Sequence, residues 1–415
     1  MKVCVIGAGV IGVTSAYFLA RQGHDVVLVD SRARPATVSS YANGGQLSYS
    51  YVAPLAGPGV LPNVPGWLLR ADSPLRFRPR LDPHQWLWCL QFALACRASV
   101  AQASTAQLQS LSYLSRDVLH HLLEEENLEF GHVRNGKLIA YRSAELLDKA
   151  RRLVAYQAAL GAEQRVLDAE ETVALEPALA GLGTNLAGAV YTPSEEAGDC
   201  RLFTESLFRR LKELDNVECR MATPVRGLRR EGRKIVAVET ANGDIPADAV
   251  VLAAGVASRN LIKPLGRDLP LYPLKGYSLS VPLEPGDDTA PAISVTDYER
   301  RIVYARIGRV LRIAAMVDIG SPNADIDPAR IALLKQQVRE AFPQLDLSQA
   351  VSWAGQRPAT PTGKPLIGNS RVADNLWLNV GQGALGFTLA CGSAALLTAQ
   401  MSGLELPIDA APFRP

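Results

Sequence analysis

The 415-residue sequence predicts an α/β fold with two interleaved domains. A strand, a glycine-rich turn, a helix and a second strand follow one another within residues 2–30, an order typical of a Rossmann-like domain. Apolar strands followed by glycines recur at residues 248–255 and 376–386. Between them, residues 272–315 show several strands with turn signals and no long helix, which indicates a mainly antiparallel sheet.

The nucleotide-like features occur in three separated segments, and their positions set the domain boundaries. We predict a Rossmann-like domain formed by residues 1–50, 196–268 and 353–415. The remaining residues, 51–195 and 269–352, are predicted to form an α+β domain that binds the substrate.

The N-terminal glycines match the dinucleotide fingerprint G-x-G-x-x-G. Gly7 permits a tight turn, Gly9 lets the backbone approach a pyrophosphate, and Gly12 lets helix and strand pack closely. The helix that follows presents free N–H groups and its positive dipole end to the phosphates. Asp30, 18 residues after Gly12, stands where an acid accepts ribose hydroxyls and disfavours a 2′-phosphate. The motif therefore indicates FAD or NAD rather than NADP.

Composition excludes several other classes of protein. A hydrophobic fraction of 48% is enough for sizeable cores, and a net charge of +2 without a basic block gives no electrostatic support for nucleic-acid binding. The six cysteines show no metal-ligand spacing, so we expect reduced thiols, a cytoplasmic setting and no metal site. His120 and His121 are adjacent and cannot share one helix face.

Two apolar segments invite a membrane interpretation. Residues 376–402 carry no charge, but their glycines favour a strand, a loop and a buried helix over a membrane span. The N-terminal apolar stretch belongs to the nucleotide fold, so we expect no signal peptide. Residues 86–94 form an aromatic-rich helix that is either a packing helix or a peripheral membrane contact.

The other elements are expected in chain order from periodicity and turn signals. We predict an extended connection at 52–83, helices at 83–97, 103–127, 143–160, 199–214 and 328–342, and strands at 133–141, 188–191, 217–221, 224–229, 234–240 and 248–253.

Several longer blocks resemble the flavin D-amino-acid dehydrogenases, which belong to the glycine oxidase and D-amino-acid oxidase superfamily. The blocks are Asn43-Gly44-Gly45-Gln46, Thr192-Pro193 with Gly198-Asp199-Cys200, and residues 272–279, 355–361, 377–379 and 390–393. The resemblance runs nearly end to end. It implies FAD, a glycine-oxidase-like fold, and oxidation of a D-amino acid to an imino acid that hydrolyses to a 2-oxo acid and ammonia. It also implies a quinone or another respiratory electron acceptor, and peripheral attachment to the inner face of the cytoplasmic membrane.

One loop departs from the family pattern. Many members have Gly-His-Gly-Thr-Leu-Gly-Trp where residues 381–387 read Gly-Gln-Gly-Ala-Leu-Gly-Phe. This loop lies where the family places flavin and substrate side by side. The substrate is therefore open between a D-amino acid and a cyclic imino acid such as D-hydroxyproline or D-proline. The sequence also fits an oxygen-using amine oxidase of the same fold, or a flavin-binding subunit without turnover.

The predicted substrate site centres on Arg357, whose planar fork can hold a carboxylate by two charge-assisted hydrogen bonds. Tyr277 and Tyr304 can close the site or belong to ordinary sheet packing. Arg306 alternates with Tyr304 and is a second carboxylate contact or an exposed charge. The remaining candidates are Tyr51 and Gln382, an amide that can orient a substrate but cannot titrate.

The predicted FAD contacts come from four parts of the chain. They are Gly7, Gly9, Val10, Ile11, Gly12, Asp30, Ser31 and Arg32; Ser39, Ser40, Asn43, Gly44, Gly45, Gln46 and Leu47; Val225, Ala254 and Gly255; and Gly383, Ala384, Leu385, Gly386 and Thr388. Further along the chain, Glu195, Glu196 and Asp199 are either a carboxylate cluster or, as we favour, caps of the helix that begins near Asp199.

Overall fold

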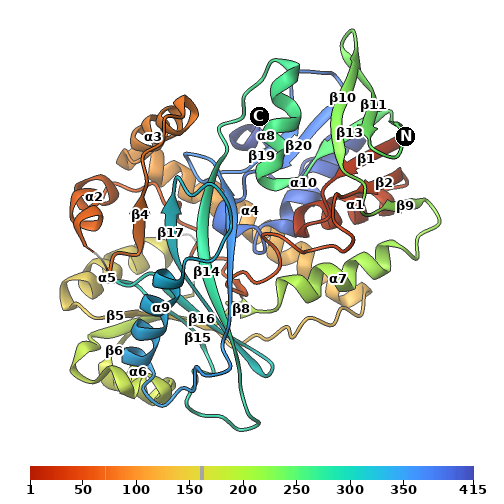
Figure 1. Ribbon diagram of the computed structural model, residues 1–415. Helices are drawn as coiled ribbons and strands as arrows, with labels where there is room; N and C mark the ends of the chain where they lie inside the picture. The colour runs from red at the N-terminus through yellow and green to blue at the C-terminus, as the bar shows by residue number, and fades with distance from the viewer. Residues whose placement is uncertain (71, 159–162) are drawn as a thin grey trace.

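A computed structural model describes residues 1–70, 72–158 and 163–415, and its core is two separate sheets (Figure 1). The first sheet has six strands in the order β19-β20-β13-β1-β2-β9, parallel except for β19. Their bounds are Lys2–Ile6 (β1), Asp25–Val29 (β2), Val217–Arg220 (β9), Ala249–Leu252 (β13), Leu366–Asn369 (β19) and Leu376–Val380 (β20). This is the predicted Rossmann-like arrangement, with the fingerprint at the carboxyl end of a central strand.

Helices cover one face of the six-stranded sheet, where a single apolar cluster joins them. They are α1 (Val10–Arg21), α4 (Ala98–Glu125), α7 (Cys200–Leu211) and α10 (Ala390–Ser402). On the other face lie α8 (Ser258–Ile262) and a small antiparallel sheet of β10 (Val225–Glu231), β11 (Lys234–Thr240) and β12 (Ile245–Pro246). Within the described residues, no helix has both the length and the apolarity to cross a membrane.

The second sheet has nine strands, eight of them in the order β18-β14-β17-β16-β15-β5-β7-β6, with β4 added beside β17. Most pairs are antiparallel, as predicted, and β15–β5 and β17–β4 are parallel. The strands are β4 (Leu75–Phe77), β5 (Lys137–Tyr141), β6 (Arg165–Asp168), β7 (Gly188–Thr192), β14 (Tyr272–Pro282), β15 (Ser294–Asp297), β16 (Ile302–Ile307), β17 (Val310–Ile319) and β18 (Val351–Ala359).

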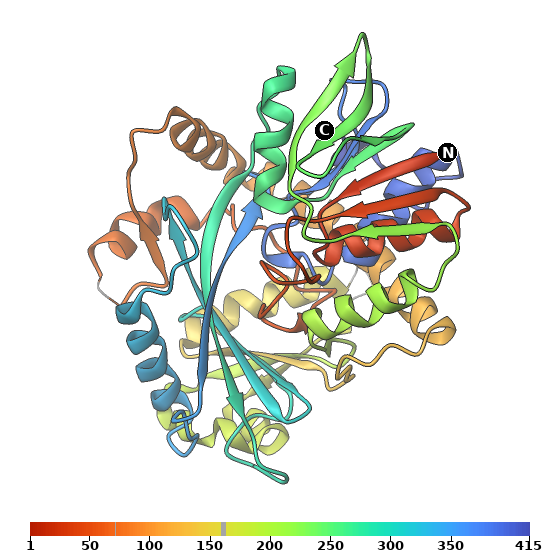
Figure 2. The same cartoon turned by 45° about the vertical axis from the view of Figure 1, so that its right-hand side comes forward.

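The two faces of this sheet have different neighbours. Helix α9 (Pro328–Ala341) and the short helix α6 (Ala169–Leu175) belong to the apolar cluster on one face, which we call the outer face. The opposite, inner face receives residues 39–47 of the N-terminal half: Ser278 Oγ donates to the Ala42 carbonyl at 2.7 Å, and Arg312 Nη1 donates to the Asn43 carbonyl at 3.0 Å. The strand pair β3 (Gln46–Leu47) and β8 (Glu196–Ala197) completes this junction. Figure 2 shows the early part of the chain, in red, passing between the two sheets.

Two expectations need correction or comment. The stretch 52–83 is not a plain extended connection, because it contains α2 (Val60–Leu69) and β4, followed by α3 (Pro83–Ala95). Pro62 is tolerated in the first turn of α2, where an N–H would have no helical acceptor. The helix predicted at 143–160 is α5 (Ala144–Ala158), and its predicted end lies outside the described residues.

The predicted domain boundaries remain a prediction, but one strand crosses a boundary and one helix packs against the other predicted domain. Residue 353 falls within β18, which pairs with β14 along its whole length. Helix α4, assigned from the sequence to the substrate domain, packs on α10, and its leucines, such as Leu108 and Leu111, belong to the apolar cluster beneath the six-stranded sheet. Both elements therefore tie the two halves together.

Candidate active site

The fingerprint turn forms a cradle that has no room for side chains. Gly7 has a φ of 111°, and a Cβ on it would lie 2.6 Å from the Ala253 carbonyl oxygen. A Cβ on Gly12 would lie 1.7 Å from the Gly7 carbonyl oxygen. Gly9 caps α1 without a side-chain hydrogen bond, and the Val10 N–H donates to Ser40 Oγ at 3.0 Å. The first turn of α1 thus presents backbone amides and a positive dipole end, which suits a diphosphate.

Asp30 directly follows β2, beside this cradle. Its carboxylate accepts from the Ala8 N–H and from the Arg32 N–H, each at 2.7 Å. The Thr223 N–H donates to the Asp30 carbonyl at 2.8 Å, which brings the chain leading to Val225 beside the same acid. Ser31 and Arg32 are exposed. The predicted adenosine contacts therefore gather around the carboxyl ends of β1 and β2.

Residues 39–47 lie against the inner face of the nine-stranded sheet with almost no clearance. Gly45 has a φ of 68°, and a Cβ on it would come within 2.4 Å of Ile307 Cδ1. Asn43 Oδ1 accepts from the Gly45 N–H at 3.1 Å and closes the turn. Ser39 Oγ donates to the Gln356 carbonyl, one residue before Arg357, at 2.7 Å. The segment can therefore carry a ring system between the two sheets next to Arg357.

The loop after β20 continues the same site, but Gln382 is turned away from it. The Gln382 amide is buried and donates to Asn379 Oδ1 at 2.6 Å, and Asn379 donates to Ser15 Oγ of α1 at 3.0 Å. Thr388 Oγ1 accepts from the Ser48 N–H at 3.3 Å and lies 3.5 Å from the Gln46 carbonyl. Thr388 thus joins the loop to residues 46–48, whereas Gln382 anchors the loop to α1.

Arg357 extends from β18 across the inner face of the sheet. A Cβ on Gly276 would lie 2.2–2.6 Å from the atoms of the Arg357 guanidinium, so the side chain passes directly over this glycine of β14. Its Nη1 donates to the Met316 carbonyl at 3.0 Å. No carboxylate of the described residues pairs with Arg357, and burial lowers the pKa of its guanidinium to about 10. A half-buried cation without an internal anion can bind the anionic group of a ligand.

A β-bulge supplies the carbonyl that orients Arg357. The register between β14 and β17 shifts between Lys275 and Tyr277, and Met316 on β17 has a φ of 67°. Positive φ is uncommon outside glycine, and bulges of this kind occur beside active sites. The bulge turns the Met316 carbonyl toward the guanidinium.

Tyr277, Tyr304 and Arg306 lie away from Arg357. The two tyrosines belong to the apolar cluster on the outer face, where Tyr304 packs edge-on against Phe342 with ring centroids 4.9 Å apart. Arg306 donates to the Asp287 carbonyl at 2.8 Å. Tyr277 donates to Asp318 Oδ2 at 2.9 Å. The structure therefore does not bring these three side chains to the inner face, and we leave them out of the proposed substrate contacts.

Tyr51 lies further along the inner face, beside a lysine that sequence reasoning missed. Lys137 Nζ is 4.5 Å from the centre of the Tyr51 ring and donates to Ser48 Oγ at 2.7 Å. Burial lowers the pKa of Lys137 to about 8, whereas burial raises the pKa of Glu195, whose charge faces it. A lysine inside the apolar run Lys137–Tyr141 is the sequence signal that could have revealed this buried pair.

The carboxylate cluster divides into two roles. Asp199 caps α7, as favoured, by accepting from the Arg201 N–H at 2.8 Å. Glu196 is buried and accepts from His120 at 2.6 Å and His132 at 2.8 Å. Within the chain segments that the structure describes, no group of three or more His, Cys, Asp or Glu side chains is arranged to hold a metal ion.

The fold and the glycine cradle define a dinucleotide-binding oxidoreductase. The chain belongs to the DAO family of FAD dependent oxidoreductases, whose family model matches residues 2–400.

Individual relatives are similar over nearly the whole chain. The sequence is 51% identical to D-amino acid dehydrogenase 2 of Ralstonia nicotianae, with 100% of this chain and 99% of the relative covered. It is 50% identical to D-amino acid dehydrogenase 2 of Pseudomonas aeruginosa, with 98% and 96% covered.

Solved structures show the same fold at low sequence identity. Glycine oxidase from Geobacillus kaustophilus matches with a TM-score of 0.77 and 21% identity over 100% of this chain and 98% of that one. L-proline dehydrogenase from P. horikoshii matches with a TM-score of 0.76 and 16% identity over 98% and 95% of the two chains.

Proposed function

We propose that this protein is an FAD-dependent dehydrogenase that oxidises a D-amino acid at Cα to an imino acid, which water converts to a 2-oxo acid and ammonia. The observation that carries the proposal is Arg357, a half-buried guanidinium without an acidic partner among the described residues, facing the segment 39–47 between the sheets. The names of the relatives with 50–51% identity support a D-amino acid as the reactant.

The glycine cradle fits FAD because a Cβ at Gly7 or Gly12 would fill the space that the diphosphate needs. Asp30 would accept from the ribose hydroxyls, and residues 43–47 with Thr388 would hold the ring system. When bound, FAD supplies a hydride acceptor, chemistry that no amino-acid side chain provides.

The chain's own residues supply orientation. Arg357 binds the reactant's carboxylate by two charge-assisted hydrogen bonds, and Gly276 leaves room for the guanidinium to reach it. The sheets on either side exclude water. No side chain near Arg357 is assigned as a general base. The reactive form is the free amine, because an ammonium has no lone pair to assist loss of hydride, so kcat/KM falls at low pH.

Anaerobic reduction of the flavin by a panel of D- and L-amino acids tests the proposal. The panel includes both epimers of proline and 4-hydroxyproline, since a cyclic imino acid is the second candidate reactant. We expect reduction by D-epimers and, for Arg357→Ala, a KM roughly a hundredfold higher with normal flavin content. Purified protein that stays colourless after reconstitution with FAD, or reduction by L-epimers alone, contradicts the proposal.

For the electron acceptor we propose a membrane quinone, as the family resemblance implies, with dioxygen as the alternative. Oxygen uptake measured with and without a soluble quinone separates the two. Flavin reoxidation that is much faster with the quinone than with air supports the dehydrogenase, and equal rates support an oxidase.

We propose in addition a cytoplasmic location with peripheral contact to the membrane. The exposed surface of α3 supports the membrane contact. Trp86, Leu87, Leu90 and Leu94 are 46–59% exposed, and Leu81 just before the helix is fully exposed. Such a row of large apolar side chains is unusual on a surface that faces only water. Exposed arginines flank it, namely Arg78, Arg80 and Arg97, so the contact suits an anionic lipid surface.

Cosedimentation with phosphatidylglycerol-containing vesicles tests this surface. We expect Leu87→Ser/Leu90→Ser to lose binding, whereas Leu153→Ser, an equally exposed leucine on α5, keeps it. Equal binding by all three proteins contradicts the assignment.

A further inference from the structure

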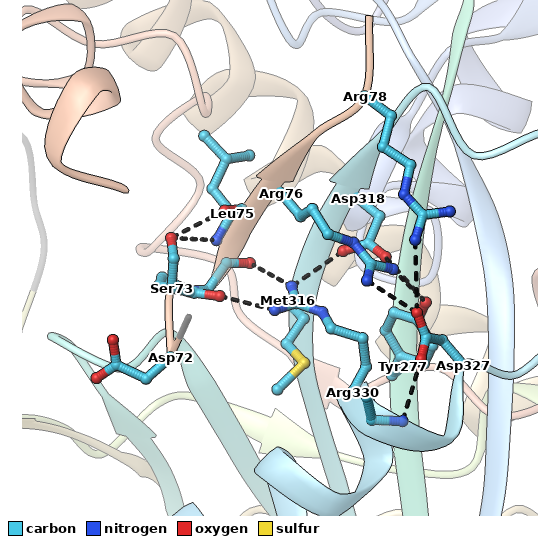
Figure 3. A network of polar contacts seen from close by, with 12 residues as sticks. Asp72, Ser73, Leu75, Arg76, Arg78, Tyr277, Met316, Asp318, Asp327 and Arg330 are labelled. Atoms are coloured by element: carbon cyan, nitrogen blue, oxygen red, sulfur yellow. Dashed lines mark hydrogen bonds and ion pairs between the residues drawn. The ribbon is translucent and has the colours of Figure 1, made fainter. Parts of the chain in front are cut away.

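Behind Arg357, on the outer face of the nine-stranded sheet, lies a buried acid that the proposed reaction does not use. Asp318 on β17 is 0% exposed, and Figure 3 shows its carboxylate surrounded by donors. Tyr277 donates to Oδ2 at 2.9 Å, Arg330 Nη2 lies 3.0 Å from Oδ1, and Arg76 makes a further ion pair. A buried carboxylate with two guanidiniums and a phenol is costly to assemble, so its location needs a reason.

The location is the strand segment next to the bulge. Asp318 pairs with Lys275, and the register shift that follows includes Met316, whose carbonyl accepts from Arg357. The Val317 N–H between them donates to the Pro74 carbonyl at 2.8 Å, which joins β17 to the chain leading into β4. This hydrogen bond therefore fixes the backbone of β17 at the bulge to the segment that precedes β4.

Asp318 also connects three elements of the fold, namely β4, α9 and β14. Arg76 belongs to β4 and makes a second ion pair with Asp327, the N-cap of α9, at 2.8 Å. Arg330 belongs to α9 and donates to the Ser73 carbonyl at 2.8 Å. Tyr277 belongs to β14. All three donors converge on one carboxylate, so β4, α9 and β14 are fixed relative to the end of β17 (Figure 3).

We propose that Asp318 is a positioning residue for substrate binding: it holds the Met316 bulge, and the bulge orients Arg357. The inference rests on the proposed role of Arg357 as the carboxylate anchor. A positive φ at Met316 is not favoured by the residue itself and persists only where its surroundings impose it. Without the Asp318 charge, Arg76 and Arg330 repel each other, β4 separates from β17, and the Met316 carbonyl loses its direction toward Arg357.

Tyr277 acts through Asp318 and does not touch the reactant. Its hydroxyl orients the carboxylate, and burial together with the neighbouring Asp318 charge raises the pKa of Tyr277. Tyr277 thus has an indirect role, in place of the direct substrate contact that the sequence predicts.

The test compares Asp318→Asn and Tyr277→Phe with a matched buried ion pair on the same sheet. Asp297 on β15 is 4% exposed and accepts from Arg142 Nε at 3.0 Å and Nη2 at 2.6 Å, but it lies away from the bulge. For each FAD-loaded variant we measure Tm, flavin content, KM and kcat with the best D-amino acid, and the Kd of benzoate by calorimetry. Benzoate carries a carboxylate but no oxidisable Cα–H.

We expect Asp318→Asn to raise KM and the benzoate Kd at least tenfold with kcat within a factor of about three, and Tyr277→Phe to raise both about threefold at nearly wild-type Tm. Asp297→Asn lowers Tm but leaves KM and the benzoate Kd unchanged. Should Asp318→Asn fail to fold, Tyr277→Phe against Asp297→Asn decides.

Equal effects of the Asp318, Tyr277 and Asp297 substitutions on ligand affinity overturn the inference while leaving the proposed function intact. If wild-type protein oxidises no D-amino acid, the proposed function fails, and benzoate binding still tests the positioning role. If wild-type protein binds neither benzoate nor a D-amino acid, both fail.

Discussion

The carboxyl ends of the six-stranded sheet and the inner face of the nine-stranded sheet offer different chemical groups to a ligand. At the first, Gly7, Gly9 and Gly12 remove side chains so that backbone amides reach the ligand. At the second, Arg357 reaches across a neighbouring strand and depends on Gly276 and Met316 of β14 and β17. The nucleotide site is therefore local in sequence, whereas the anchor depends on the register between strands tens of residues apart. Four sets of substitutions test this contrast, from the largest expected effect to the smallest.

Gly12→Ala should remove the cofactor altogether. Its Cβ would lie 1.7 Å from the Gly7 carbonyl oxygen, a backbone atom that cannot move without opening the turn. We expect purified protein without flavin absorbance. Gly57→Ala is the matched control, because a Cβ there meets nothing within 4 Å. Normal flavin content in Gly12→Ala would show that the cradle is looser than the contacts indicate.

Gly276→Ala should leave flavin bound but displace the anchor. The new Cβ would lie 2.2 Å from Arg357 Nη2, and a flexible guanidinium can move where a backbone cannot. We expect KM for the amino acid to rise about tenfold, equivalent to about 1.4 kcal/mol of binding, with unchanged flavin content. An unchanged KM would remove Gly276 from the site.

Lys137 should make stability rise with pH. Its pKa is about 8 in the folded protein and near 10.5 when exposed, so the unfolded chain binds more protons between these values. The contribution of Lys137 to the free energy of unfolding then increases from pH 8 to 10.5, by at most about 3 kcal/mol. Denaturant unfolding of wild-type protein and the Lys137→Met/Glu195→Gln variant over this range measures the difference, and parallel curves would contradict it.

Tyr304→Phe should change almost nothing. The hydroxyl is buried and has no hydrogen-bond partner among the described residues, so its removal leaves no group unsatisfied. We expect KM and kcat within a factor of two and stability within about 0.5 kcal/mol of wild type. A tenfold loss of kcat would return Tyr304 to the active site and contradict the division between the two sheet faces.

The same contrast explains which features could be predicted from the sequence. The fingerprint, the strands around it and Arg357 follow from local motifs and a family resemblance. The faces of Tyr277 and Tyr304 could not be predicted, because they depend on the pairing register of β14, β16 and β18, strands that lie far apart in the sequence. Helix α2 was missed because its prolines and glycines have the composition of a loop. Asp318, a single acid in the run Ile313–Ile319, has a role that only its burial and partners reveal.

Strand β18 has a consequence for how substrate enters and product leaves. It carries Arg357, and it is fastened to the nucleotide half on both sides: the Gln356 carbonyl accepts from Ser39, and Ala359 forms a β-bridge with Gln382. These two attachments lie on either side of Arg357 in the sequence. Folding therefore fixes the distance from its guanidinium to residues 39–47 and to the loop after β20. We therefore expect entry and exit of small molecules to need only local rearrangement, without a hinge between the two halves.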